Sequence, residues 1–372
     1  TDPADTLKYD KAVYIFASDH IAILNASLSN FDGYGIHIRD ASTNTTVHNN
    51  LIFYTPEFVT DQSSVYGIYV QYNDLADNVT ITNNQVYGLK YASATVYGIR
   101  VWKVSGLIAN NFVAISDDSN DKIYGLRLDA GDPDLEMDVY YNTIYLAGEA
   151  TDAGYAVYKT GTDGTLNVMN NIFINERTGA FDHLAIDYTF VAGVWNADYN
   201  LYYAPNGHLG DWGDTVCSSM AEWQAASGVE AHSVSKAVEF TGDYDLHLTG
   251  ASLGDYDLAG IPLAGITIDI DLETRHEVNP YIGGDENLEY PLDPEQQYMI
   301  NVNPLNLDFG TIYNGTESDS LLFTIQNAGM DILTVYSVTA PPAGFQLRTA
   351  AIDWTTSLEE FNLDLAEMEV VY

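Results

Sequence analysis

The residues best suited to chemistry in the N-terminal half of the chain are arginines that recur among aromatic residues. Six arginines are present in the whole sequence, and Arg39, Arg100 and Arg127 lie near histidine, tyrosine or tryptophan. A guanidinium group pairs with a carboxylate or a sulfate through two parallel hydrogen bonds. Aromatic rings stack on sugar faces. One surface that held all of these residues would therefore have the chemistry of a groove for an acidic polysaccharide.

A repeat decides whether these residues share a surface. The tripeptide Tyr-Gly-Ile, or a close variant, begins at Tyr34, Tyr66, Tyr97, Tyr124 and Tyr155, at intervals of 32, 31, 27 and 31 residues. Short apolar alternations in each unit predict strands, and no unit contains an amphipathic run long enough for a helix. Insertions differ from unit to unit. This pattern predicts a parallel β-helix, in which each coil lays its strands on those of the coil before.

A second sequence marker, an Asn, recurs with about the same period as the tripeptide. An Asn, usually the second of a pair, recurs at positions 50, 84, 111, 142, 171 and 200, and Asn25 is taken as an earlier copy on the same interior ladder. At a corner, an Asn side chain can bond to its own turn and to the Asn of the next coil, and Asn tolerates the left-handed conformation that such bends need. The two markers together predict stacked coils with an interior Asn ladder.

The repeat places the arginines on one outward surface. If the residue after Tyr-Gly points inward, the following residue faces solvent. The first outward column is then His37, Tyr69, Arg100, Arg127 and Tyr158, and the second is Arg39, Gln71, Trp102, Asp129 and Thr160. The candidate glycan-binding residues are His37, Arg39, Tyr69, Arg100, Trp102, Arg127 and Tyr158. The alternative is a stacked ladder stabilised by arginine–aromatic contacts, and we prefer it because parallel sheets favour such stacking without a ligand.

Catalysis on this surface is the rival hypothesis. A polysaccharide lyase needs a cation that neutralises the uronate and a base that removes the neighbouring proton, and the outward residues are of the right types. Against it, a net charge of −40 repels polyuronate. No carboxylate cluster that could hold calcium lies in register with the arginines. We therefore assign no catalytic residue, and an enzyme stays the alternative.

Two acidic loops are candidate calcium sites, because oxygen-rich loops suit Ca²⁺. Their candidate ligands are Asp129, Asp132, Asp134 and Glu136 in the first loop and Asp269 and Asp271 in the second. Neither loop has EF-hand spacing, and neither shows the Gly-rich nonapeptide of calcium-binding β-rolls. Solvated loops are the preferred interpretation, since acids are abundant, and no cofactor is required. His247 is expected to be structural.

Composition excludes several classes of function. The 372 residues include 13 Lys and Arg against 53 Asp and Glu. Such a chain is repelled by nucleic acids and by anionic membranes. Hydrophobic residues make up 46%, enough for large cores, yet no apolar run approaches the ~20 residues needed to span a bilayer. Cys217 is the only cysteine, which excludes an internal disulfide.

The sequence also resembles known secreted proteins. Residues 12–203 are similar to the right-handed parallel β-helix repeats of pectin-degrading enzymes and of many secreted bacterial surface proteins. Motifs such as Asp245-Leu246-His247-Leu248 and Gly283-Gly284-Asp285-Glu286 follow in an order that resembles the C-terminal region of large secreted β-helix proteins, notably those of Bacteroidetes. Residues 298–372 resemble the Ig-like, choice-of-anchor-type modules that follow such β-helices. The resemblance implies an extracellular or cell-surface location.

The expected fold is all-β: a right-handed parallel β-helix of about seven or more coils, followed by a partial Ig-like β-sandwich. Residues 1–203 are assigned to the coils, and residues 204–290 to a C-terminal β-helix region with one short helix at 218–226. Residues 291–297 are assigned to a linker and residues 298–372 to the Ig-like module. That module is shorter than the ~100 residues of a complete Ig domain, so both ends are expected to lie inside a longer protein.

The expected function is that of a non-catalytic segment of a secreted or cell-surface protein. Such a rigid rod would serve in adhesion, in glycan contact or in the presentation of other domains. The expected partner is a polysaccharide, or a protein of the cell surface or the secretion machinery.

Overall fold

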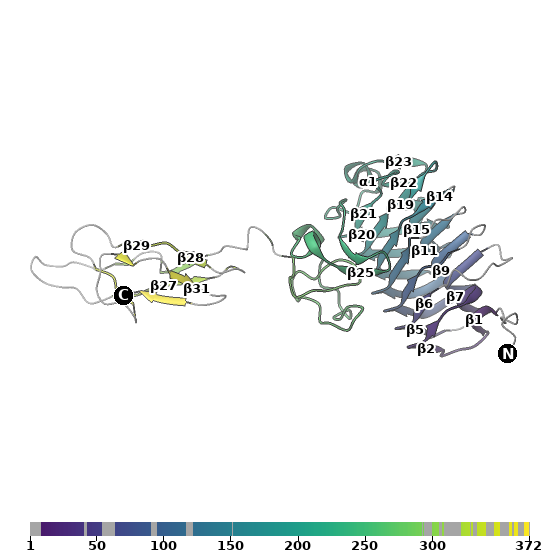
Figure 1. Ribbon diagram of the computed structural model, residues 1–372, viewed down its shortest axis with the longest axis horizontal. Helices are drawn as coiled ribbons and strands as arrows, with labels where there is room; N and C mark the ends of the chain where they lie inside the picture. Colours follow the sequence, from purple (N-terminus) through teal and green to yellow (C-terminus); the bar gives the residue numbers. More distant parts are fainter. Residues whose placement is uncertain are drawn as a thin grey trace, which may run out of the picture. The chain divides into compact units, whose positions relative to one another are not determined.

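The computed structural model describes residues 9–40, 43–53, 64–90, 95–116, 122–150 and 152–291, together with shorter stretches between residues 293 and 371 (Figure 1). The chain divides into two compact units, Thr1–Pro291 and Leu292–Tyr372. The first unit contains long parallel sheets, and the second is built from short antiparallel strands. None of the helices in the described residues is both long and apolar enough to cross a membrane.

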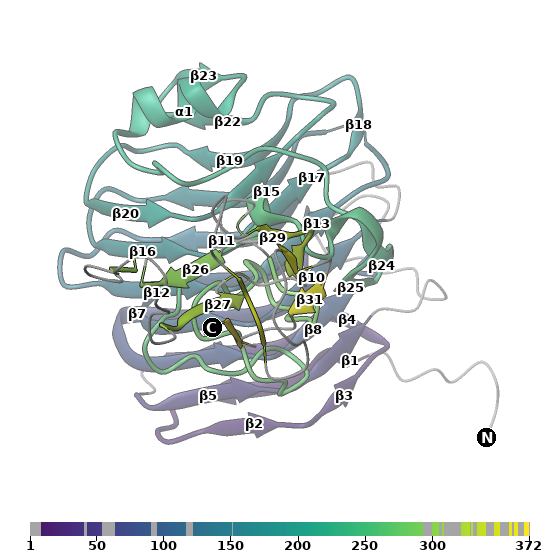
Figure 2. The ribbon, with the colours of Figure 1, turned by 90° about the vertical axis from the view of Figure 1, so that its left-hand side faces the viewer.

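The first unit winds into coils whose parallel strands form three faces (Figure 2). The first face contains β1 (Tyr9–Phe16), β4 (Phe31–Arg39), the N-terminal parts of β7 (Ser64–Thr82) and β9 (Thr95–Ala109), β11 (Ile123–Asp129), β15 (Gly154–Thr160), β19 (His183–Tyr188) and β22 (Gly210–Trp212). The second face contains β2 (Ala22–Leu24), β5 (Thr45–His48), the C-terminal parts of β7 and β9, β12 (Glu136–Tyr140), β16 (Thr165–Met169) and β20 (Val194–Asp198). The third face contains β3 (Ser27–Leu28), β6 (Leu51–Phe53), β8 (Gln85–Tyr87), β10 (Phe112–Ile115), β13 (Thr143–Leu146), β17 (Ile172–Asn175) and β21 (Leu201–Tyr203). Because β7 and β9 continue around the corner, the first two faces join into one sheet.

Aliphatic side chains stacked in register fill the interior of the coils. On the first face, Ile36 pairs with Ile68, Ile68 with Ile99 and Ile99 with Leu126, and all four side chains are fully buried. Each coil can bury its apolar residues only against its neighbours, so the repeat itself makes the core. The predicted parallel β-helix is confirmed. The expected count of about seven coils stays a prediction. The count depends on whether the first coil is included, and its strands on the second and third faces have only three and two residues.

The Asn ladder runs along the interior beside the third face. Nδ2 of Asn50 donates to Oδ1 of Asn84 at 2.9 Å, and the same bond continues through the next four coils at 2.9–3.0 Å, joining Asn84, Asn111, Asn142, Asn171 and Asn200 in turn. The residue before each ladder Asn adopts the left-handed conformation, with φ between 53° and 58°. The ladder prediction is confirmed for these six residues.

The earliest coil departs from the ladder. Asn25 is exposed and has a φ of 55°, so it occupies the left-handed position that precedes the ladder. Ala26 occupies the ladder position, and its N–H donates to Oδ1 of Asn50 at 2.9 Å. The expectation that Asn25 lies on the interior ladder is therefore wrong by one residue, because this coil has only one Asn where most later coils have a pair.

One helix follows the coils. β22 turns back into β23 (Thr215–Cys217), and α1 (Met220–Ser227) begins directly after it. Ser219 caps the helix by accepting the N–H of Glu222 at 3.3 Å, while Gly228 ends it with a φ of 74°. Ser at the N-cap and Gly at the C-terminal end are common capping residues, and the helix lies where the sequence predicts one. Trp223 on α1 is fully buried and packs against Tyr202 at the end of the β-helix core.

Residues 229–290, here named the returning segment, run back along the side of the β-helix. The segment includes β24 (Phe240–Gly242), β25 (Asp245–Leu248) and the short 3₁₀ helices η1 (Gly250–Ser252) and η2 (Tyr256–Leu258). It covers the outer side of the third face, where Leu246 and Ile270 pack on Phe112, and Leu258 and Ile282 pack on Ile172. This cover explains why β10 and β17 are apolar at nearly every position, as strands buried on both sides are.

Corner residues bind the returning segment to the coils. Nδ2 of Asn83 donates to the carbonyl of Asp269 at 2.6 Å, and Nδ2 of Asn110 to that of Ile268 at 2.8 Å. Nδ2 of Asn170 donates to the carbonyl of Ile261 at 2.7 Å. These three asparagines occupy the left-handed position before a ladder Asn, and they bond to the segment through their side-chain amides. Arg275 adds a buried contact, with its guanidinium 3.8 Å from the ring centre of Tyr141.

The second unit contains short antiparallel pairs. β26 (Ile300–Asn303), β27 (Phe323–Asn327) and β32 (Met368–Val371) form a three-stranded sheet. β28 (Leu333–Val335) pairs with β31 (Phe361–Leu363), and β29 (Val338–Thr339) with β30 (Ser357–Leu358). A small core that includes Ile325, Leu358 and Val371 holds the pairs together. The Ig-like character of this unit stays a prediction.

Candidate functional site

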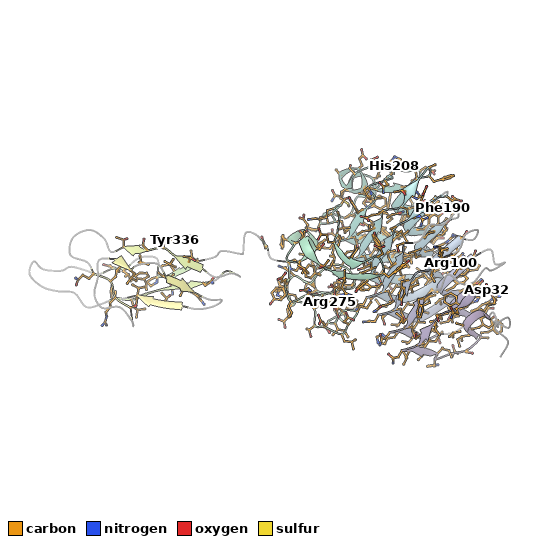
Figure 3. All side chains as sticks on the ribbon, in the orientation of Figure 1. Asp32, Arg100, Phe190, His208, Arg275 and Tyr336 are labelled. Atoms are coloured by element: carbon orange, nitrogen blue, oxygen red, sulfur yellow. The ribbon has the colours of Figure 1, made fainter. Side chains whose placement is uncertain are left out.

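The predicted outward columns lie on the first face. Strand register pairs His37 with Tyr69, Tyr69 with Arg100, Arg100 with Arg127 and Arg127 with Tyr158. The second column pairs in the same way, as Arg39, Gln71, Trp102, Asp129 and Thr160. All seven candidate glycan-binding residues therefore share one surface; Figure 3 labels Arg100 on it. We name this surface the tyrosine–arginine face.

A third column on this face was not predicted from the sequence. Tyr34, Tyr66, Tyr97, Tyr124 and Tyr155 stack ring on ring, with centroids 4.5–5.2 Å apart and interplanar angles of 14° or less. Strict alternation would point each Tyr inward together with the Ile two residues later. The small residue between them breaks the alternation, because it faces the interior together with the residue that follows it, as Gly98 and Ile99 do and as Ala156 and Val157 do in the last copy. A Cβ on Gly98 would lie 2.3 Å from Cγ1 of Val113.

The two central arginines share one carboxylate within the face. Nε of Arg100 lies 2.7 Å from Oδ2 of Asp129, and Nε of Arg127 lies 2.8 Å from Oδ1 of the same carboxylate. The guanidinium of Arg100 also covers the rings of Tyr69 and Tyr97, at 4.9 and 5.2 Å from their centres. Both arginine side chains are less than one-fifth exposed. Two cations share one anion, so the cluster keeps one net positive charge.

The residues at the ends of the columns are engaged differently. His37 is buried between the rings of Tyr34 and Tyr69, at 4.4 and 5.2 Å between centres. Arg39 is 44% exposed and lies beside Asp40, with 3.1 Å between Nε and Oδ2. Tyr158 packs edge-on against Tyr124 and Tyr155.

Proton affinities on this face do not suit a general base. Burial lowers the pKa of His37 to about 4, and Lys11 and Arg39 lower it further. Burial raises the pKa of Tyr69 and of Tyr124, in spite of the neighbouring arginines. Burial likewise raises the pKa of Tyr155 to about 12. At neutral pH His37 is a weak base and these three tyrosines hold their protons, whereas proton removal is most efficient when the base has a pKa near the working pH.

The first acidic loop does not gather its predicted ligands. Asp129 is engaged by the two arginines, and Oδ1 of Asp132 accepts the N–H of Asp134 at 3.1 Å in a local turn. Asp134 and Glu136 are exposed. A calcium ion needs six to eight oxygens around one point. The prediction of calcium binding at Asp129, Asp132, Asp134 and Glu136 gains no support from this arrangement.

The second acidic loop separates its two predicted ligands. Asp269 is fully buried; its Oδ1 accepts the N–H groups of Asp271 and Glu273, and its Oδ2 accepts that of Glu286, at 2.8–3.0 Å. Asp269 therefore shapes the loop. The side chain of Asp271 reaches a different residue, His247, which was expected to be purely structural.

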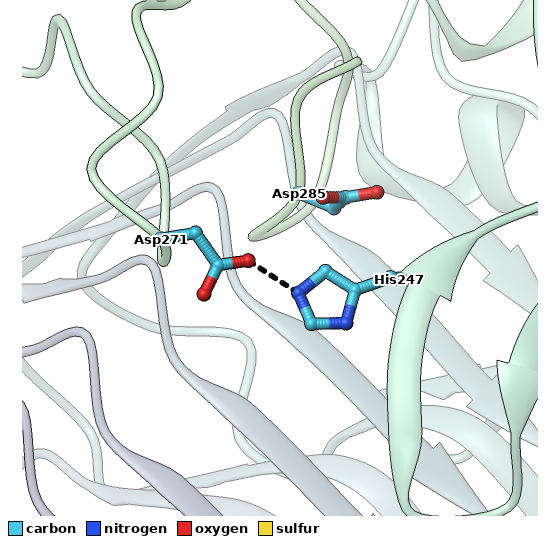
Figure 4. Close-up of side chains that lie close together, drawn as sticks. All are labelled: His247, Asp271 and Asp285. Carbon is cyan, nitrogen blue, oxygen red and sulfur yellow. Dashed lines mark hydrogen bonds and ion pairs between the residues drawn. The ribbon is translucent and has the colours of Figure 1, made fainter.

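His247, Asp271 and Asp285 form a compact cluster that the sequence did not reveal (Figure 4). Within the described residues, it is the only group of three or more His, Cys, Asp or Glu side chains whose ligand atoms all lie within 4.8 Å of one another. Burial alone would lower the pKa of His247, but hydrogen bonds to Asp245 and Asp271 outweigh it and the pKa is raised. Burial raises the pKa of Asp285 to about 6. No local motif joins these residues, which are 24 and 14 positions apart.

Comparison with known proteins bears on the coils. Residues 11–192 match the family model described as "Right handed beta helix region". No curated protein matches the chain. The matched residues include most of the strands of the three faces described above. The family match and the stacked parallel coils together show that these residues form a right-handed β-helix.

Proposed function

We propose that the chain is a non-catalytic rod within a secreted or cell-surface protein, and that it presents other domains at a distance. The observation that carries this proposal is that the side chains of the tyrosine–arginine face are already in contact with one another. The ring faces of its central tyrosines lie against neighbouring rings or guanidinium groups, and one carboxylate pairs with both central arginines. A sugar ring would have to stack on surfaces that are already covered.

Rigidity supports the same proposal. Hydrogen-bonded sheets, an interior amide ladder and an exterior aromatic ladder all run in the direction in which the coils stack. The returning segment then covers the third face, whose strands would otherwise expose apolar residues. Bending the stack of coils would disrupt the sheets, the amide ladder and the aromatic ladder together. A location outside the cell and a role in adhesion rest on the sequence resemblance alone.

Glycan contact is the second candidate, and one observation favours it. The pair of arginines around Asp129 keeps one net positive charge on a chain of net charge −40. An anionic sugar group could approach there along the tyrosine edges. Partners of this kind would be acidic polysaccharides, bound weakly and in a manner that salt suppresses.

The test uses the full chain and a panel of acidic polysaccharides, with ultraviolet absorbance reporting unsaturated uronate and equilibrium binding reporting contact. The rod proposal expects neither product nor saturable binding, and it expects Arg100→Ala to lower thermal stability. Binding without product, lost in Arg100→Ala at unchanged fold, would support glycan contact instead. Product that disappears in Arg100→Ala would overturn the non-catalytic proposal.

A further inference from the structure

The cluster of His247, Asp271 and Asp285 brings together three parts of the returning segment. His247 lies on β25, Asp271 lies in the turn that Asp269 shapes, and Asp285 follows the glycines that pack against the third face. Figure 4 shows the carboxylate of Asp271 directed at the His247 ring, with Asp285 close by. The ring of His247 also packs edge-on against Phe112 on β10, with 5.2 Å between centres.

Both ring nitrogens of His247 face carboxylate oxygens. Nδ1 lies in close contact with Oδ1 of Asp245, and Nε2 lies 2.5 Å from Oδ2 of Asp271. A neutral imidazole has only one N–H, so one of the two nitrogens would direct a lone pair at a carboxylate. Two arrangements remove that repulsion: a second proton on the ring, or a cation between the nitrogen and the carboxylate.

Asp285 distinguishes this cluster from an ordinary ion pair. The residue is only 5% exposed, and a buried carboxylate needs compensation of its charge. Its Oδ2 accepts the N–H of Leu248 at 2.7 Å, while its other oxygen has no hydrogen-bond donor among the described residues. Arg275 is engaged elsewhere, by Asn110, Glu286 and the ring of Tyr141. Around one imidazole, the cluster therefore collects the carboxylates of Asp245, Asp271 and Asp285.

We propose that Nε2 of His247 and the carboxylates of Asp271 and Asp285 bind one divalent transition-metal cation, with Zn²⁺ as the best match. One imidazole nitrogen with two carboxylate oxygens is a donor set that suits Zn²⁺. Calcium prefers oxygen ligands alone, so it is the poorer match. Asp245 would accept the Nδ1 hydrogen and so fix the tautomer that leaves Nε2 free, an arrangement common around metal-bound histidines.

The geometry requires only a small movement. Ligands of one zinc ion lie about 2.0–2.2 Å from the metal, and the three ligand atoms here already lie within 4.8 Å of one another. The side chain of Asp271 is 47% exposed, so it can withdraw from Nε2 while its backbone stays bonded to Asp269. The fourth position would open to solvent beside this exposed side chain.

A cation here would join three loops of the returning segment beside the β-helix. β25, the turn at Asp271 and the bend before Asp285 would be held at one point, next to Phe112 of the third face. Binding to the folded state alone raises the stability of that state. The cation would therefore hold the returning segment in place on the third face and stabilise the folded state.

Metal content and thermal unfolding of the full chain test the proposal. After treatment with a chelator and dialysis, the chain is given ZnCl₂ or CaCl₂, and bound metal is counted by mass spectrometry. We expect one zinc per chain, a rise in melting temperature of about 2–4 °C at saturation, and no comparable effect of calcium. Asp271→Asn should lose the bound zinc and the rise, because it removes a ligand from an exposed position. His232→Ala is the matched control: that histidine also contacts an aspartate, with 2.7 Å between Nδ1 and Oδ2 of Asp198, and its loss should leave zinc binding unchanged.

Nitrogen NMR of the His247 ring separates the two arrangements. Bound zinc should leave one protonated nitrogen and shift the signal of Nε2. A ring that stays doubly protonated at neutral pH and is unaffected by zinc would overturn the proposal in favour of an imidazolium ion pair. Equal zinc uptake by the wild-type chain and Asp271→Asn would overturn it as well.

Discussion

Nδ2 of Asn200 donates to Oε2 of Glu230 at 3.1 Å, so the interior Asn ladder ends on a buried carboxyl group. Glu230 adopts a φ of 69° directly after the helix region, and it also accepts hydrogen bonds from Tyr202 and Ser233. Every ladder Asn needs an acceptor for its amide in the next coil. Glu230 supplies that acceptor where the next Asn is missing.

The Glu230 carboxyl predicts a pH dependence of stability. Burial raises its pKa to about 7 in the folded chain, although three hydrogen bonds act in the opposite direction. The unfolded chain releases this proton near pH 4.5, so between about pH 4.5 and 7 the folded state binds more protons. This contribution to stability is complete below pH 4.5 and is lost as pH rises through 7, to the extent of about 3 kcal/mol.

The measurement compares thermal unfolding of the wild-type chain and Glu230→Gln at pH 5 and pH 8. Glutamine keeps an oxygen acceptor and does not titrate. Buried Asp285 and Glu286 also have raised pKa values, yet they are present in both chains and cancel in the comparison. The wild-type chain should lose more stability than Glu230→Gln between the two pH values. Equal losses would show that Glu230 is not the titrating group.

The Asn ladder should be sensitive at its centre. Asn142 donates to Asn171 and to the carbonyl of Ile108, and its Oδ1 accepts the amides of Asn111. Asn142→Ala leaves these buried groups without partners, which should lower the free energy of unfolding by about 3 kcal/mol. Chemical denaturation measures the loss. Asn196→Ala is the control: it removes an exposed Asn–Asn bond of 2.9 Å to Asn167, and its effect should stay within about 0.5 kcal/mol.

The sequence predicted the coils because their determinants recur along the chain. Equivalent residues such as Ile68 and Ile99 stack on one another, so a period in the sequence becomes a column in space. The register of Arg100 with Arg127 followed from the same period. The Asn ladder was predicted for the same reason, and only the first coil, where Ala26 stands on the ladder, broke the rule.

Contacts that join distant parts of the chain could not be predicted in this way. Asn83 binds the carbonyl of Asp269, 186 residues later, and no repeat in the sequence links the two. The contact between His247 and Asp271 also depends on the path of the returning segment. The tyrosine column was missed for a local reason: an inward Gly such as Gly98 leaves no trace in an apolar–polar pattern, because it has no side chain to classify.

The tyrosine–arginine face should contribute measurably to stability. Arg100→Ala removes a guanidinium that pairs with Asp129 and covers two tyrosine rings, and it leaves a partly buried carboxylate with one cation instead of two. We expect a loss of about 1–2 kcal/mol in the free energy of unfolding. Arg39→Ala is the control, since its side chain is 44% exposed and surface ion pairs of this kind contribute little. A similar loss in both variants would contradict a structural role for the Arg100 cluster.

The glycine inside each Tyr-Gly pair should be irreplaceable. A Cβ on Gly98 would lie 2.3 Å from Cγ1 of Val113 and 2.5 Å from the carbonyl oxygen of Gly125 in the next coil. Neither neighbour can withdraw without breaking the stack, so Gly98→Ala should cost about 3 kcal/mol or more in unfolding free energy. Gly242→Ala on β24 is the matched control, because nothing lies within 4 Å of the added Cβ. If calorimetry finds Gly98→Ala as stable as Gly242→Ala, the inward position of Gly98 is wrong, and with it the explanation of why the tyrosine column faces outward.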